Sequence, residues 1–299
     1  MIFWRIVDNN LYPVNEAEKL GFEESEGLRI PDEYLEKQEF MIMRTCHGIG
    51  DWGIISAMPR LLKEKYPNSK VYLPSPKFIE KLFKDYESNW GIWNEPFKNV
   101  KNIFDNNPYV DDYRDDISGE IFHDHYRIYD NNNVNVPMVE QILKFWQFEE
   151  DEYKDSQPEM YWSDEEKKLG DSIIKEYVGD KEFGCLLISN RLGTQYGKHD
   201  EISYKNDIQK VEKLLNENKL PYFYWTHNPI NDTPFNFIDK VLDIRNMDFR
   251  IQMYIRCKAK VNIGNQSGAL QMSTRYSDTY DVQRQFPMGH NFVKGENYL

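Results

Sequence analysis

The sequence predicts an α/β protein of two similar domains, each built around a parallel sheet. Three observations support this prediction. In both halves, short apolar runs of strand length alternate with segments whose apolar residues recur at helical spacing. In each half, a glycine-containing turn separates one such run from the helix that follows it. The length of 299 residues also suits two domains better than one.

The first half opens its pattern with the apolar run 40–43, which predicts a strand. A turn at 47–50 leads into a helix predicted from about Asp51 to Tyr66, with apolar residues on one face. The next strand is predicted at 70–73, and a strand–helix–strand unit favours parallel pairing. The later predictions are a helix around 78–83, strands within 100–104 and 120–129, and a helix face over 139–146.

The second half repeats the alternation. Ser163 is predicted to begin a helix that extends to about Glu176, and Glu166 completes the pattern of a capping box. The further predictions are a strand at 184–189, a loop at 190–199, a helix around 208–215, a strand at 221–226, a helix at 249–257, a strand at 260–263 and a helix from 268 to about 276.

Between the halves, residues 149–158 are acidic and lack periodicity, so we place the domain boundary there. The predicted domains are therefore residues 1–158 and 159–299. Residues 1–38 combine a short apolar run with acidic, turn-rich sequence. We expect them to form an extension packed on the first domain.

The composition excludes several classes of protein. Hydrophobic residues make up 40% of the chain, which is too many for a disordered protein. The net charge of −13 disfavours nucleic acid as a partner. Without a stretch of about 18 apolar residues, no membrane span is expected. The N-terminus meets Asp8 before a signal-peptide core can form, and the three cysteines lack metal-site spacing, so we expect a cytoplasmic protein with reduced thiols. The sequence indicates no oligomeric state.

The first candidate site is the turn that contains His47, Gly48 and Gly50, followed by Asp51. Glycines between a strand and a helix let the backbone approach a ligand, and the helix N-terminus presents free N–H groups. Asp51 suits two roles: a helix cap, or a base that takes a proton from a hydroxyl at the end of a strand. The spacing differs from G-x-G-x-x-G and no acidic residue suitably follows the next strand, so a nicotinamide site is rejected.

The second candidate site is the turn at 264–268, which includes Gln266, Ser267 and Gly268. The backbone amides of Ser267 and Gly268, the Ser267 hydroxyl and the helix dipole together suit a phosphate group. A tight connection without a ligand is the alternative. One turn falls in each half, so the phosphate-binding turn and the base would lie on different domains. Such an arrangement suits a ligand bound in a cleft between the domains.

The loop after the strand at 184–189 carries two cations, Arg191 and Lys198. They suit the diphosphate of a leaving group, or they are solvated loop charges. The run from Gly193 to Lys198 is one residue too short for a P-loop and lacks its Ser or Thr. His123 and His125 would share one face of a strand, but no third ligand is evident, so no metal is predicted. The sequence also has no Asp-x-Asp motif, which could hold a cation between two phosphates.

Three segments resemble one family. The run Gly48–Asp51, followed by Pro59 and by the stretch Leu61–Pro67, resembles the opening of the ADP-heptose:lipopolysaccharide heptosyltransferase family. The stretch Asn107–Asp111 is similar to its Asn-Pro-hydrophobic-hydrophobic-Asp segment. The turn Gly264–Gly268 is similar to its Gly-x-Asp-Ser-Gly turn.

The resemblance covers roughly residues 40–276 and implies a GT-B fold, in which two Rossmann-like domains face a central cleft. It implies an inverting, metal-independent glycosyltransferase that needs no cofactor. The N-terminal domain would bind a glycan or other hydroxyl acceptor, and the C-terminal domain would bind a nucleotide-diphosphate sugar. Carried across, Asp51 is the base, Lys198 contacts the donor phosphate, and Ser267 with Gly268 forms the phosphate turn.

The sequence departs from the family at three points. Gln266 replaces an Asp, Gln271 replaces a His, and Lys198 is not followed by the family's x-Trp. A glutamine keeps its hydrogen bonds but carries no charge, so the donor can differ from ADP-heptose. The alternatives are a catalytically silent GT-B module that binds a nucleotide sugar or glycan, a GT-B sugar-nucleotide epimerase, and a fucosyltransferase-like enzyme. The two glutamines favour the silent module, and the retained Asp51 opposes it.

Overall fold

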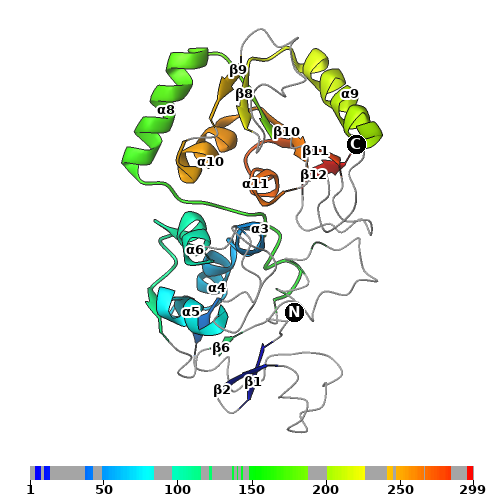
Figure 1. Cartoon of the computed structure of the whole chain (residues 1–299). Coiled ribbons are helices and arrows are strands. Elements are labelled where there is room, and N and C mark those ends of the chain that lie inside the picture. Colours follow the sequence, from blue (N-terminus) through cyan, green and yellow to red (C-terminus); the bar gives the residue numbers. More distant parts are fainter. Residues whose placement is uncertain are drawn as a thin grey trace. The chain divides into compact units, whose positions relative to one another are not determined.

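The chain divides into two compact units, residues 1–156 and 157–299, which Figure 1 shows in a computed structural model. Each unit has its own sheet and its own core. The described residues are 4–7, 10–13, 38–42, 49–83, 96–115, 121–122, 137, 140, 143, 148–187, 201–225, 241–244, 247–265, 267–283 and 295–298.

The main sheet of the first unit contains β3 (Glu39–Met41), β4 (Lys70–Pro74), β5 (Asp112–Arg114) and β6 (Ile121–Phe122). All of its pairings are parallel, in the order β5-β4-β3-β6. The order reverses at β3, because the chain builds outward to β5 and then places β6 on the other side of β3. A separate antiparallel pair joins β1 (Trp4–Val7) to β2 (Asn10–Pro13).

The single helix predicted from Asp51 to Tyr66 is wrong, because the structure has two: α3 (Ile49–Gly53) and α4 (Met58–Lys65). Pro59 explains the break, since it has no N–H to donate to Ile55 one turn earlier. The Ile55 carbonyl accepts the N–H of Met58 instead, at 3.0 Å. Pro59 therefore stands in the first turn of α4, where a helix tolerates proline.

The strand predicted within 100–104 is also wrong, because these residues end α6 (Pro96–Phe104). Val100, Ile103 and Phe104 are all buried, and their spacing of three and four residues fits a helix. The short apolar cluster did not distinguish the two elements by itself. The helix predicted near 78–83 is confirmed as α5 (Pro76–Phe83).

The acidic segment before Gln157 is tied to α4 by two basic side chains. Lys65 Nζ lies 2.5 Å from Glu152 Oε2. Arg60, whose side chain is 10% exposed, donates to the Asp155 carbonyl at 2.6 Å. Because these cations point at the acidic segment, the charge run serves as a structural element of the first unit.

Asp111, at the end of the family-like Asn-Pro stretch, joins three elements. Its carboxylate accepts from Lys63 of α4 at 2.6 Å, from Lys70 at 3.1 Å and from the Val71 N–H at 2.8 Å. Burial alone would raise the pKa of Asp111, but these hydrogen bonds outweigh it and hold the pKa below its usual value. These contacts lie at the amino ends of β4 and β5, whereas such sheets bind ligands at the carboxyl ends of their strands. Asp111 therefore has a structural role.

The sheet of the second unit has six described strands, all parallel, in the order β12-β11-β10-β7-β8-β9. The chain thus builds outward from β7 to β9 and then returns to β10, beside β7. The sequence predicted β7, β8 and β10, but not β9, β11 or β12. The strands are β7 (Gly184–Leu187), β8 (Tyr222–Trp225), β9 (Val241–Asp243), β10 (Val261–Asn265), β11 (Asp278–Gln283) and β12 (Glu296–Tyr298).

Helices cover both faces of this sheet (Figure 1). On one face, α9 (Glu201–Asn218) packs on Leu186, Ile263 and other apolar residues of the strands. On the other face, α8 (Asp164–Val178) and α10 (Phe249–Lys258) enclose a second apolar cluster that includes Cys185. The predicted α/β class with parallel sheets is therefore confirmed in both units.

The N-terminus of α8 confirms the predicted capping box. The Ser163 side chain accepts the Glu166 N–H at 3.2 Å, and Glu166 accepts the Ser163 N–H at 2.7 Å. Glu166 also binds Nε of the buried Arg250 at 2.5 Å, which joins α8 to α10. The last predicted helix is shorter than expected: α11 (Gly268–Gln271) ends early, and tight turns occupy residues 272–276.

The strands β7 and β10 approach each other closely at Gly264, which pairs with Leu187. A Cβ atom at Gly264 would lie 2.3 Å from the Leu187 carbonyl oxygen. Two strand backbones cannot relax around such a contact as a flexible side chain can. Glycine is therefore required at this position.

We expect Asp111→Asn to destabilise the first unit at pH 7 by about 1–2 kcal/mol, because it removes charge-assisted hydrogen bonds. The pKa of Asp111 is lowered in the folded state, so its contribution is present above the unfolded value of about 4 and is lost as pH falls through the folded value. Urea unfolding of parent and variant at pH 7 and pH 3 checks this. A difference between the two proteins that stays constant with pH would contradict the role of the charge.

We expect Gly264→Ala to lower the free energy of unfolding of the second unit by roughly 1–3 kcal/mol through this backbone clash. Lys260→Ala, at an exposed position before the same strand, is the matched control and should be nearly neutral. Urea unfolding followed by circular dichroism measures both variants. Equal stability of the parent and Gly264→Ala would show that the strands can separate freely.

Candidate functional site

The strand order of the second unit reverses between β7 and β10, and the carboxyl ends of these strands lie level at Leu187 and Gly264. In open parallel sheets, ligands bind outside the carboxyl ends of the strands at such a reversal. Both predicted donor-side segments start here. The chain enters the loop of Arg191 and Lys198 from β7, and it enters the turn of Ser267 from β10. The fold thus brings together the starting points of two segments that are far apart in sequence.

Ser267 caps α11 and keeps one hydrogen-bonding function in reserve. Its backbone is extended, its Oγ accepts the Leu270 N–H at 3.3 Å, and its carbonyl accepts the Gln271 N–H at 2.9 Å. The hydroxyl hydrogen can still be donated to an anion. The first amides of a helix also lack carbonyl partners one turn earlier. The turn therefore offers donors, as a phosphate requires.

Beyond the turn, α11 is anchored in the second unit. Ala269, Leu270 and Gln271 are all buried, and Leu270 is completely enclosed. The amides of Gln271 and Met272 bond back to the Ser267 and Gly268 carbonyls. The turn is thus held by a packed helix, which fixes the direction of its free donors.

The register of β11 against β10 shifts beside this turn. Gly264 pairs with Asp281, but Asn265 pairs with Gln283, so Val282 is an extra residue in β11. The Val282 carbonyl accepts a hydrogen bond of 3.1 Å from Lys210 Nζ of α9. Asp281, only 1% exposed, brings a carboxylate to the same end of the sheet. Sequence analysis identified neither Lys210 nor Asp281, because neither belongs to a glycine turn.

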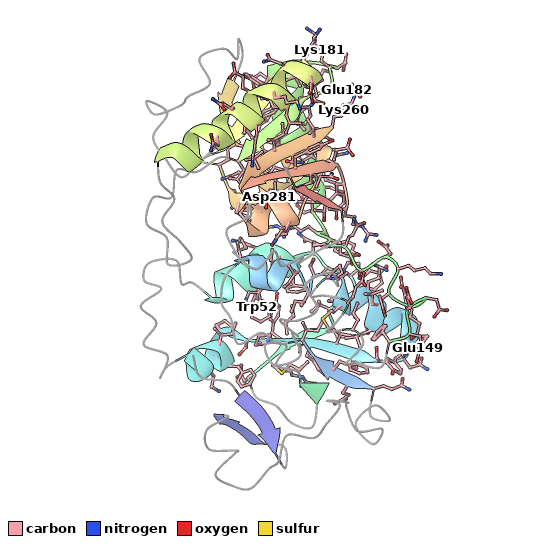
Figure 2. The ribbon with its side chains drawn as sticks, turned by 90° about the vertical axis from the view of Figure 1, so that its right-hand side faces the viewer. Trp52, Glu149, Lys181, Glu182, Lys260 and Asp281 are labelled. Carbon is pink, nitrogen blue, oxygen red and sulfur yellow. The ribbon has the colours of Figure 1, made fainter. Side chains whose placement is uncertain are left out.

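The opposite end of this sheet carries ordinary surface charges. Glu182 and Lys260 precede β7 and β10, and their side chains pair at 2.7 Å while largely exposed. Figure 2 shows these two residues with Lys181 at the amino ends of the strands, and Asp281 toward the carboxyl ends. The buried Asp281 therefore lies toward the end of the sheet where a ligand is expected. The exposed pair of Glu182 and Lys260 lies at the other end.

In the first unit, the predicted acceptor-side turn leaves β3, the strand at which the order reverses. The helix α3 follows, and Asp51 is its third residue, so Asp51 is not the residue that caps this helix. Beside it, Trp52 (labelled in Figure 2) is completely buried. Its ring lies edge-on to Phe104 of α6, with the ring centroids 6.3 Å apart. Trp52, which sequence analysis missed, therefore fixes α3 to the unit.

Several predicted site residues lie outside the described part of the chain. They are His47, Gly48, Arg191, Lys198 and Gln266, and the side chain of Asp51 is also outside it. Gly50 is described, and its carbonyl accepts the Ile54 N–H at 3.0 Å. The roles assigned to these residues stay predictions.

Two cysteines of the second unit have no free thiolate to offer. Burial raises the pKa of Cys185 to about 12, although Arg256 opposes the shift. Burial likewise raises the pKa of Cys257. Both thiols are therefore protonated at neutral pH, and Cys185 packs in the apolar cluster beside α8 and α10. Neither suits nucleophilic catalysis.

Metal binding and membrane spanning find no support within the described residues. No described His, Cys, Asp or Glu residues form a group of three that could hold a metal ion, and the pair His123 and His125 lies outside this part of the chain. None of the described helices combines the length and apolar character needed to cross a membrane.

Comparison with known proteins gives a distant likeness. No family model and no curated protein matches the sequence. A family 9 glycosyl transferase of Veillonella parvula DSM 2008 is 10% identical with a TM-score of 0.48, covering 92% of this chain and 87% of that chain. An E. coli ADP-heptose LPS heptosyltransferase II is 8% identical with a TM-score of 0.40, covering 87% and 90%. POFUT1 in complex with GDP is 12% identical with a TM-score of 0.39, covering 88% and 98%. A likeness at these values assigns no activity, and the function of this chain has to be inferred from its own residues.

Proposed function

We propose that the chain is an inverting, metal-independent glycosyltransferase of the GT-B type. It moves a sugar from a nucleotide-diphosphate donor to a hydroxyl of a glycan or similar acceptor. One observation carries the proposal. The two segments predicted to hold the donor leave neighbouring strands, β7 and β10, where the order of a six-stranded parallel sheet reverses.

The proposed donor site neutralises the diphosphate without a metal. The Ser267 hydroxyl and the first amides of α11 would donate to phosphate oxygens, and Arg191 and Lys198 would supply positive charge. The sequence has no Asp-x-Asp motif to hold a bridging cation. These groups would stabilise the charge that develops on the leaving nucleotide diphosphate.

The proposed chemistry is a direct displacement. The Asp51 carboxylate takes the proton of the acceptor hydroxyl as its oxygen attacks the anomeric carbon. The bond from that carbon to the donor phosphate oxygen breaks on the opposite face, and nucleotide diphosphate leaves. The configuration at the anomeric carbon is thereby inverted. The acceptor would lie beside the turn of His47, Gly48 and Gly50.

The function is tested by incubating the chain with ADP-, GDP- and UDP-sugars in excess EDTA, with and without candidate glycan acceptors, and measuring nucleotide diphosphate release. Acceptor-dependent release with inverted product is expected. Binding without release would instead support a silent module. An altered sugar that remains attached to its nucleotide would support an epimerase, and a strict requirement for Mg²⁺ or Mn²⁺ would contradict the donor-site assignment.

We expect Asp51→Asn to reduce turnover by a factor of roughly 10² or more while nucleotide-diphosphate binding persists, as for the loss of a general base. The neutral amide keeps the shape of the side chain, so circular dichroism should be unchanged. Lys77→Ala, which changes an exposed surface charge of the same unit, is the matched control. An Asp51→Asn protein that turns over like the parent would remove Asp51 from the mechanism.

We expect Gly268→Val to weaken nucleotide-diphosphate binding by about 1–3 kcal/mol, because a side chain at this turn would displace phosphate from its donors. Lys198→Ala should weaken nucleotide diphosphate more than the unphosphorylated nucleoside, since only the former is an anion. Titration calorimetry of folded variants measures both effects. If both variants bind as the parent does, the donor site lies elsewhere.

A further inference from the structure

The extra residue in β11 lies beside the exit of β10 into the proposed phosphate turn. Between Gly264 and Asn265 the pairing advances by one residue in β10 but by two in β11, from Asp281 to Gln283. Bulges of this kind bend a strand, re-aim its neighbours and occur often next to functional sites. The backbone position of Asn265, at the end of β10, therefore depends on how Val282 is held.

Val282 is held from one side by α9. Its side chain is completely buried in the apolar cluster that also contains Val211, Leu214 and Leu215 of that helix. Its carbonyl accepts a hydrogen bond from Lys210 Nζ, one residue before Val211, at 3.1 Å. A charged donor makes this contact stronger than an ordinary neutral hydrogen bond. The same helix thus holds both the side chain and the backbone of the extra residue.

The position of α9 in the chain gives this contact a wider role. The helix begins at Glu201, directly after the loop that carries Arg191 and Lys198. Its Lys210 contact ties that helix to β11, while β11 pairs with β10 up to the turn of Ser267. One hydrogen bond therefore connects the helix that follows one proposed phosphate-binding segment to the strand beside the other.

We propose that Lys210 is a positioning residue for the phosphate turn. By binding the Val282 carbonyl, it fixes the register shift of β11 against Gly264 and Asn265 and so sets the direction of the Ser267 and Gly268 donors. This inference rests on the proposed function for its ligand, but the structural link itself does not. Lys210 acts through the backbone and need not contact the donor.

The test uses the full chain with Lys210→Met, which keeps the length of the side chain and removes the ammonium group. Lys210→Arg restores a charged donor, and Lys210→Gln is a milder variant should the methionine protein fold poorly. Lys213→Met, at an exposed position of the same helix, is the matched control. Each protein is measured by amide hydrogen exchange and by calorimetric titration with ADP, GDP, UDP and the corresponding nucleosides.

We expect Lys210→Met to raise hydrogen exchange at the amides of Leu270, Gln271 and Met272, whose bonds to Ser267 and Gly268 report the turn. Exchange in β7 and β8 should not change. Nucleotide-diphosphate affinity should fall roughly fivefold to tenfold with little change for the nucleosides, the scale of losing one ordinary hydrogen bond between the turn and a phosphate. Lys210→Arg should restore both measurements, and Lys213→Met should match the parent.

The proposal is overturned if exchange at the turn is unchanged in Lys210→Met, if it rises equally throughout the second unit, or if Lys213→Met has the same effect. A parent protein that binds none of the nucleotide diphosphates contradicts the proposed function instead. The exchange measurement then still decides whether Lys210 positions the turn.

Discussion

The contact between the β7 and β10 backbones at Gly264 is the constraint on which the second unit depends. The strand order reverses there, and the chain leaves both strands there toward the proposed donor-binding segments. The two apolar clusters of the unit also meet at these strands, since Leu186 and Ile263 face α9 while Cys185 faces α8 and α10. A side chain at Gly264 would separate the strands, so the same glycine serves the core and, in our proposal, the donor site.

In the first unit, too, a proposed site residue follows the strand at which the sheet order reverses, but different residues hold it. Its sheet reverses at β3, and the helix that follows is cut short because Pro59 cannot continue it. The buried ring of Trp52 then secures the short α3, which carries Asp51. The charged residues of Asp111's network lie at the other end of the strands and stabilise the fold. The structural charges thus lie at the amino ends of the strands, and the proposed functional residue follows a carboxyl end.

The net charge of −13 makes the local arrangement of donors important for any phosphate ligand. At a distance the chain repels anions, but charges separated by more than about 8–10 Å are largely screened at physiological salt. Binding therefore has to come from groups at close range. The Ser267 hydroxyl oxygen accepts the Leu270 N–H, and its hydrogen can still be donated. The turn therefore favours ligands that accept hydrogen bonds, such as phosphate oxygens. Lys210 contributes indirectly in our proposal, by holding the strand beside that turn.

The sequence by itself determined the elements whose signals are local. The apolar runs of β7, β8 and β10, the Ser163–Glu166 capping box of α8 and the glycine turns were all evident from a few adjacent residues. Tertiary structure alone decided the rest, because strand order, the helix at 96–104 and the register shift at Val282 depend on partners distant in sequence. Strand β11 shows why. Two of its buried residues, Thr279 and Asp281, are polar, so no apolar pattern indicated a strand there. Pairing with β10 makes those residues part of a strand, while Tyr280 and Val282 of the same strand join the apolar cluster of α9.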